Sequence, residues 1–180
     1  MTDTGNERVQ VFSTDGTFLR AFGGYGVEPG KLIEPVGIVI GPDGNVYVAD
    51  SGNGRIAIFT TGGQFIANID VPQWKAQSER VNYLAFGPDG VLYATTPSTG
   101  EVLAVGNSQI AVVGSSTTSE EFERPMGIKV DADGTLLVVD SGKATVVEFR
   151  PVVPATVKPN GAATPEASPV EPESSQSPPG

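Results

Sequence analysis

Three aspartates recur at one position of a repeated sequence and are the first candidates for chemistry. Asp3, Asp50 and Asp140 each begin an Asp-Thr-Gly or Asp-Ser-Gly turn segment. A ring of such carboxylates could hold a divalent cation, with Ca²⁺ as the natural choice for oxygen ligands. The simpler interpretation, which we expect to hold, is that each aspartate accepts backbone N–H bonds within its own turn.

Other side chains that could do chemistry are scarce. The sequence contains no histidine and no cysteine, which removes the commonest general base and the usual zinc ligands. The stretch DADG at 131–134 resembles the start of a calcium loop, but no glutamate follows at the required spacing. The apolar runs VGIVI, NYLAF and MGIKV offer only Asn82 and Lys129 as polar side chains, too few for a catalytic constellation. We therefore expect no catalytic residue and no cofactor, with Ca²⁺ as the alternative.

These candidates lie on a sequence repeat. Residues 3–22 match residues 50–69, and the turn tripeptide PDG at 42–44 returns at 88–90 and, as ADG, at 132–134. One repeat holds four short β runs, at 36–40, 45–49, 55–60 and 64–69, divided by turn residues. Short connections predict antiparallel neighbours. The runs are apolar on both faces, so each sheet should be covered on both sides.

The repeat carries a family resemblance. Residues 35–66, PVGIVIGPDGNVYVADSGNGRIAIFTTGGQFI, resemble an NHL repeat, whose pattern runs Pro-x-Gly-Ile, Asp-Gly-Asn-x-Tyr-Val-Ala-Asp and Asn-x-Arg-Ile-x-Val-Phe. The third unit departs most, with Tyr83 in place of the glycine and Thr96 in place of the aspartate. The resemblance implies an all-β fold: a β-propeller of four-stranded antiparallel blades, usually six in a ring.

This chain should supply about half of such a ring. We expect a partial propeller at 1–150, made of a half blade (1–22), two blades (35–69 and 81–113) and a three-stranded blade (125–150). An open half ring would expose two apolar blade faces, at about 5 kcal/mol each. The expected remedies are missing upstream blades, which would make this chain a fragment of a longer protein, or closure by a homodimer.

The remaining residues, 151–180, are rich in Pro, Ser and Glu and contain no aromatic residue. Such a segment cannot bury enough apolar surface to offset its ordering entropy. It is therefore predicted to be a disordered tail.

The three longest connections, 23–35, 70–80 and 114–125, should share one end of the array and form a binding face. Each carries one aromatic ring. The binding-face candidates are Tyr25, Lys31, Trp74, Lys75, Arg80, Phe122 and Arg124. Trp74 is the expected exposed anchor; the alternative is that each ring plugs the gap between two blades.

Charge limits the partners of this face. The chain has a net charge of −10, and acidic residues outnumber basic ones in the three connections, so nucleic acid is not expected. No apolar run is long enough to enter a membrane. The predicted function is that of a non-catalytic interaction or scaffold module that binds a protein or other ligand. By the family resemblance we place it outside the cytoplasm, within a larger bacterial protein. The alternative is the remnant of a lactonase- or lyase-like propeller enzyme that uses a central divalent cation.

Overall fold

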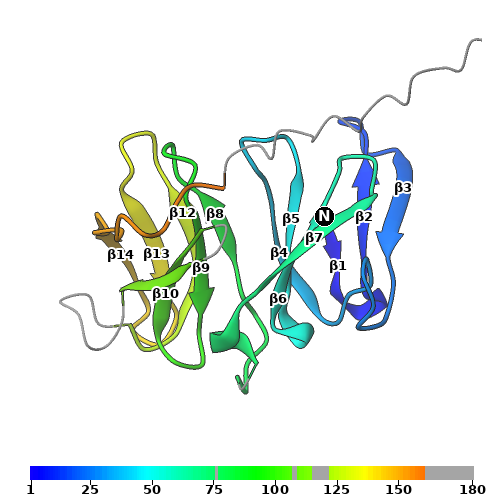
Figure 1. The fold of residues 1–180 in the computed structure, drawn as a ribbon. Coiled ribbons are helices and arrows are strands. Elements are labelled where there is room, and N and C mark those ends of the chain that lie inside the picture. The colour runs from blue at the N-terminus through cyan, green and yellow to red at the C-terminus, as the bar shows by residue number, and fades with distance from the viewer. Residues whose placement is uncertain (76, 107–108, 115–121, 161–180) are drawn as a thin grey trace, which may run out of the picture.

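A computed structural model of the chain describes residues 1–75, 77–106, 109–114 and 122–160 as a row of four antiparallel sheets (Figure 1). The first sheet consists of β1 (Thr2–Asp3), β2 (Arg8–Phe12) and β3 (Phe18–Gly23). The second consists of β4 (Pro35–Ile40), β5 (Val46–Asp50), β6 (Arg55–Phe59) and β7 (Phe65–Asp70). The third consists of β8 (Leu84–Phe86), β9 (Leu92–Thr96), β10 (Glu101–Val105) and β11 (Ile110–Gly114). The fourth consists of β12 (Pro125–Val130), β13 (Leu136–Asp140) and β14 (Thr145–Phe149).

Within each sheet the strands follow chain order, as the short connections predict. The predicted strands of the second sheet agree with the observed ones to within one residue at each end. In the Gly-Pro-Asp-Gly turn, Asp43 accepts the backbone N–H of Asn45 at 3.0 Å, and Gly44 adopts a φ of 78°, which favours glycine. The first sheet has one strand more than expected, because the two-residue β1 precedes the predicted pair.

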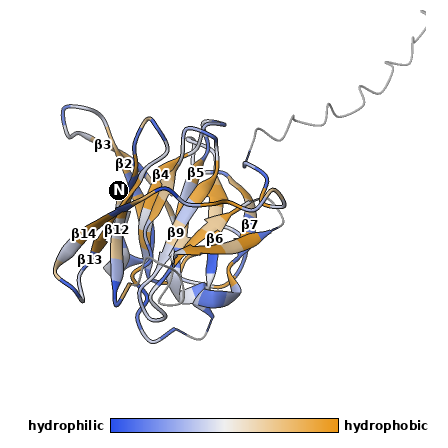
Figure 2. Ribbon diagram, turned by 90° about the vertical axis from the view of Figure 1, so that its left-hand side faces the viewer, coloured by the Kyte–Doolittle hydropathy of each residue, from blue (hydrophilic) through white to orange (hydrophobic). Residues whose placement is uncertain are grey.

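Three hydrophobic clusters lie between neighbouring sheets. The first contains Val9 and Val48, the second Ile56 and Leu103, and the third Val102 and Leu136, so each cluster joins one sheet to the next. Figure 2 shows the hydrophobic residues concentrated in the strands and the hydrophilic ones in the loops. The second and third sheets are therefore covered on both faces, as predicted. The first and fourth sheets each have one face without a neighbouring sheet among the described residues.

The predicted start of the tail at Pro151 is too early. Residues 151–160 continue the fold: Val157 is 5% exposed and packs in the cluster between the third and fourth sheets. Asn160 is buried, and its Nδ2 donates to the backbone oxygen of Val105 at 2.6 Å. The amino-acid composition did not predict these contacts, because two buried side chains, Val157 and Asn160, are enough to hold a short segment in place. The rest of the predicted tail, 161–180, lies outside the described residues.

Helix is limited to three turns of three residues each in the described part: η1 (Thr4–Asn6), η2 (Ser51–Asn53) and η3 (Pro72–Trp74). None of them has the length or the apolar content to cross a bilayer.

Candidate functional site

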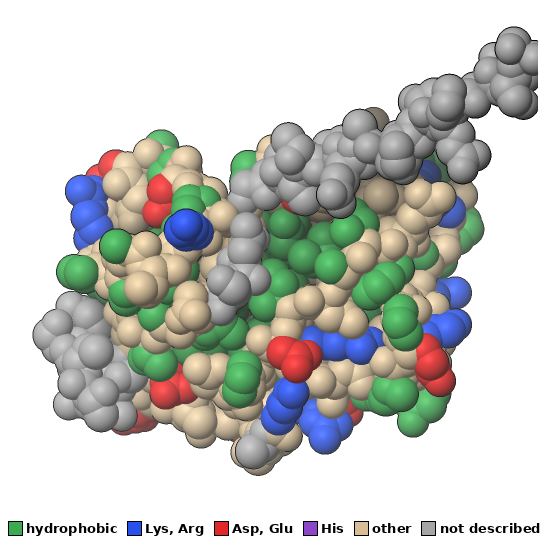
Figure 3. Space-filling view, in the orientation of Figure 1, with side chains coloured by type: hydrophobic (Ala, Val, Ile, Leu, Met, Phe, Trp, Pro, Cys, Tyr) green, Lys and Arg blue, Asp and Glu red, His purple; other side chains and the backbone are tan. Residues whose placement is uncertain are grey.

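The long connections and the 3-10 turns meet at one end of the array, the loop end, which lies at the bottom of Figure 1. Backbone hydrogen bonds tie two of the three long connections to the turn of the sheet that follows them. The N–H of Gly52 donates to the oxygen of Ile33 at 2.8 Å, and the N–H of Ser141 donates to the oxygen of Arg124 at 3.0 Å. The prediction that the long connections share one end of the array is confirmed for their described residues. Figure 3 shows charged side chains gathered along this lower edge.

The aspartates of the repeat hold these connections in place. Asp50 accepts the backbone N–H of Ile33 at 2.7 Å, and Asp140 accepts those of Glu123 and Arg124 at 3.0 and 2.9 Å. The expected turn role is confirmed for Asp140, which accepts the backbone N–H groups of Gly142 and Lys143. It is wrong for Asp3 and Asp50, which accept side-chain donors in their own turns instead. Asp50 and Asp140 also fix the connection that enters their own sheet. The described residues contain no group of three or more Asp, Glu, His or Cys placed to hold a metal ion.

In the third sheet Thr96 takes the place of the aspartate. It also holds the preceding connection, but through a side chain of that connection instead of its backbone. Thr96 Oγ1 accepts the indole N–H of Trp74 at 3.2 Å. The ring of Trp74 is 2% exposed and packs in the cluster between the second and third sheets. The prediction that Trp74 is an exposed anchor is therefore wrong.

Phe122 is also turned inward. Its ring is 3% exposed and lies 5.8 Å from that of Phe149, in the cluster between the third and fourth sheets. The alternative interpretation of these rings, as plugs between blades, is correct for Trp74 and Phe122. Neither ring is available as a surface anchor.

Tyr25 alone among the three rings faces solvent, with 74% of its surface exposed. Val27, two residues later, is 64% exposed. A parallel bridge between Tyr25 and Leu32 closes this part of the connection, and the buried Leu32 anchors it. The result is a small exposed apolar patch, Tyr25 and Val27, on a closed loop.

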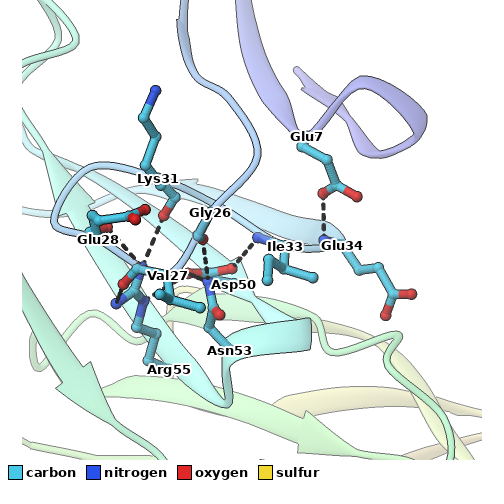
Figure 4. Close-up of polar contacts among 10 residues, drawn as sticks. All are labelled: Glu7, Gly26, Val27, Glu28, Lys31, Ile33, Glu34, Asp50, Asn53 and Arg55. Carbon is cyan, nitrogen blue, oxygen red and sulfur yellow. Dashed lines mark hydrogen bonds and ion pairs between the residues drawn. The ribbon is translucent and has the colours of Figure 1, made fainter.

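Arg55 makes that loop rigid (Figure 4). Its guanidinium donates to the backbone oxygens of Val27, Glu28 and Lys31 at 2.9, 3.3 and 2.9 Å. Its Nε pairs with Asp50 at 2.7 Å, where the carboxylate is fully buried. A planar guanidinium that satisfies three carbonyls and a carboxylate fixes the loop more firmly than a flexible ammonium would.

The pKa values of Asp50 and Asp140 shift in opposite directions. Burial raises the pKa of Asp50 above its ordinary value, against the opposing effect of its bonds from Ile33, Asn53 and Arg55. Burial also opposes ionisation of Asp140, but four backbone N–H donors outweigh it and lower the pKa of that carboxyl. Asp50 depends on its arginine, whereas Asp140 is stabilised by the backbone.

Three of the remaining candidates form ion pairs, and those of Arg80 and Arg124 join neighbouring connections. Arg80 pairs with Glu34 at 3.3 Å, Arg124 with Glu79 at 2.7 Å, and Lys75 with Asp70 at 3.1 Å. Lys31 is exposed, and its Nζ lies 3.4 Å from the backbone oxygen of Gly23. We call the first two pairs the inner rim. Arg80 and Glu34 of this rim also line a depression of about 650 Å³, together with Thr4, Val36, Gln77, Ser78 and Val81.

Sequence reasoning missed Gln77, which lies behind this rim. Gln77 and Asn82 exchange two amide hydrogen bonds, at 2.7 and 3.1 Å, and both are buried. Asn82 also donates to the backbone oxygen of Thr95 at 2.9 Å. These bonds satisfy the polar group of Asn82 within the fold.

Four successive sheets packed face to face at a common loop end define a β-propeller array. Residues 32–59 match the NHL repeat family model. The resemblance that the sequence indicated is thus confirmed for the unit that carries it best.

Three solved structures illustrate the range of proteins that share this fold. A virginiamycin B lyase from Staphylococcus aureus is 18% identical with a TM-score of 0.60, over 83% of this chain and 50% of its own. A chain of a nidogen/laminin complex is 20% identical with a TM-score of 0.54, over 83% and 58%. A putative 6-phosphogluconolactonase from Bacteroides uniformis is 18% identical with a TM-score of 0.55, over 87% and 47%.

The chain thus spans about half the length of these structures, and at such identities the likeness concerns the fold alone. No curated protein matches the sequence.

Proposed function

We propose that this chain is a non-catalytic binding module that engages a protein partner through its loop end, centred on Tyr25 and Val27. The observation that carries the proposal is the 74% exposure of the Tyr25 ring on a loop held by three guanidinium–carbonyl bonds. Tyrosine is enriched among the residues that dominate protein interfaces. A loop ordered before binding loses little conformational entropy when it binds.

The surroundings fit a protein ligand. Beside the apolar patch lie Lys31 and Glu28, one charge of each sign, and the paired charges of the inner rim continue the face. An apolar centre with a mixed polar rim is the usual composition of a protein interface. The net charge of −10 adds repulsion against nucleic acid, which therefore forms no part of the proposal.

A photo-crosslinking amino acid at position 25 tests the proposal in cells that produce the chain. We expect protein adducts from position 25 and weaker ones from position 27. The matched control is position 66, because Ile66 is a 44% exposed apolar residue on β7, outside the loop. Equal adducts from positions 25 and 66, or none from position 25, would contradict the proposal.

The enzyme alternative makes a different prediction. A central divalent cation would stabilise the folded state by mass action, so calcium would raise the melting temperature. We expect no shift with millimolar calcium, and a rise of several degrees that a chelator reverses would favour the enzyme instead.

A further inference from the structure

A pocket of about 280 Å³ lies between the third and fourth sheets, at the end of the array opposite to the loop end. The turns between β8 and β9 and between β12 and β13 supply part of its lining, and they lie at the top of Figure 1. Its apolar walls are Pro88, Val130, Pro151 and Val153. We call this site the turn-end pocket.

The pocket exists because one aromatic ring of the repeat is replaced by a smaller side chain. Tyr47 and Tyr93 hold the same position of the repeat, four residues after the aspartate of the Pro-Asp-Gly turn. The ring of Tyr47 packs edge to face on that of Phe86 at the end of β8, at a centroid distance of 5.0 Å. At the end of β12 the corresponding residue is Val130. Because valine is smaller than phenylalanine, space remains beside Tyr93 that Phe86 fills beside Tyr47.

The hydroxyl of Tyr93, which lines this pocket, has no hydrogen-bond partner among the described residues, although the side chain is only 3% exposed. By contrast, the hydroxyl of Tyr47 donates to Asp43 Oδ2 at 3.0 Å. Burial, together with the charge of Asp89, raises the pKa of Tyr93 to about 12, so the hydroxyl keeps its proton at neutral pH. Tyr93 therefore presents to the pocket a neutral hydroxyl that can still donate and accept.

Asp89 supplies the unpaired charge of the pocket. Its Oδ1 accepts the backbone N–H of Val91 at 3.1 Å, and no basic side chain of the described residues pairs with it. The other carboxylate of the lining, Asp133, pairs with Arg150 at 2.6 Å, so these two charges cancel. One negative charge remains beside the free hydroxyl, and it favours a cation.

The walls determine which kind of cation fits. A Ca²⁺ ion takes about six or more oxygen ligands, whereas this pocket offers one unpaired carboxylate and one phenol. An ammonium group on an alkyl stem makes fewer demands, because the stem can lie against apolar side chains while the charge stays at the polar end. Val130 and Val153 provide such apolar surface, and Asp89 provides the polar end.

We propose that the turn-end pocket binds an alkylammonium group, as carried by a lysine side chain of a partner polypeptide or by a free diamine. The ammonium donates to the carboxylate of Asp89 and to the oxygen of Tyr93, and the methylene stem packs between Val130 and Val153. The inference is independent of the binding module proposed for the loop end, because the pocket lies at the other end of the array.

A titration of the full, ¹⁵N-labelled chain with Nα-acetyl-lysine N-methylamide tests the proposal by NMR. The backbone N–H of Val91 is the reporter, because it donates to Asp89. We expect a saturable change in its resonance. Nα-acetyl-norleucine N-methylamide keeps the stem and lacks the charge, so it should leave the resonance unchanged.

Variants of the pocket should weaken this binding in a defined order. Val130→Phe should abolish it, because the new ring fills the pocket. Asp89→Asn should weaken it at least about tenfold, because the ion pair is lost, and Tyr93→Phe by about threefold, because one neutral hydrogen bond is lost. The matched control is Asp43→Asn, since Asp43 holds the same repeat position and is already bonded to Tyr47. This control should bind as the wild type does.

A parallel titration with 1,5-diaminopentane identifies the source of the ammonium group. Weaker binding than that of the lysine probe supports a lysine side chain, and equal or tighter binding supports a free diamine. Three results would overturn the proposal: no saturable change at Val91, equal binding of the norleucine probe, or equal loss of affinity in Asp89→Asn and Asp43→Asn. Should Val130→Phe fail to fold, Asp89→Asn decides the matter, since Asp89 is exposed.

Discussion

The connections 23–35 and 70–80 join strands of the same kind, yet they turn their aromatic rings in opposite directions. Tyr25 is 74% exposed, and Trp74 is 2% exposed. The residue at the end of the next sheet's second strand differs as well: Asp50 holds the first connection by its backbone, and Thr96 holds the second by the indole of Trp74. Of these two connections, the one fixed through its backbone carries the exposed ring, and the one fixed through its ring buries it.

The largest expected difference between the two connections is in stability. Trp74→Ala should lower the free energy of unfolding by about 3–5 kcal/mol, because it empties a packed site between two sheets. Tyr25→Ala should change it by less than about 0.5 kcal/mol, because the ring is on the surface. Chemical denaturation of the two variants measures both values. Equal losses would refute the assignment of one ring to the core and one to the surface.

The second prediction concerns the brace of the first connection. Arg55→Ala should cost about 3 kcal/mol, because it leaves the buried Asp50 carboxylate without its partner. Arg8→Ala is the matched control, since Arg8 pairs with Asp3 at the same repeat position with a side chain that is 42% exposed. That variant should cost less than about 1 kcal/mol. A cost for Arg8→Ala as large as that for Arg55→Ala would contradict the difference in burial.

The third prediction sharpens the role of Thr96. Thr96→Val should destabilise by about 1 kcal/mol, because it keeps the volume and removes the acceptor of the buried indole N–H. Thr96→Ser keeps the hydroxyl and should restore the Trp74 Nε1 proton resonance to its wild-type position. An indole resonance that is the same in Thr96→Val and wild type would show that the hydrogen bond is absent.

The smallest expected effect is on the titration of the aspartates. NMR titration should place the pKa of Asp50 above the ordinary value of 3.8 and that of Asp140 below it. For Asp50 the protonated form is favoured in the fold, so stability falls as the pH rises from 3.8 to the raised pKa. For Asp140 the contribution is present above pH 3.8 and is lost as the pH falls through the lowered pKa. A shift of both residues in the same direction would contradict their different surroundings.

Most of the fold could be predicted from the sequence, because the turn residues and apolar runs that specify the strands are local and recur in each repeat. The Pro-Asp-Gly turns and the apolar runs placed the strands of the second sheet within one residue at each end, and the spacing of the repeats predicted the stacked sheets. The order of residues 151–160 was missed, because it depends on the distant contact of Asn160 with Val105. The expected closure of the ring, by further blades or by a second copy, stays a prediction.

The site was harder to predict than the fold. Composition located the three rings in the correct connections, but the direction of each ring depends on packing between sheets that sequence periodicity does not report. The flanks of Trp74 are polar, and yet its ring is buried because the third sheet offers Thr96 as an acceptor. The buried amide pair of Gln77 and Asn82 was not expected either, because it also depends on packing.

Fluorescence of the single tryptophan tests the central contrast most directly, since Trp74 is the one tryptophan in the chain. The account predicts an emission maximum shifted to the blue of free tryptophan, and little quenching by iodide until the protein is unfolded. Emission like that of the unfolded chain, with full quenching under native conditions, would place Trp74 at the surface and contradict the assignment of Tyr25 as the exposed ring.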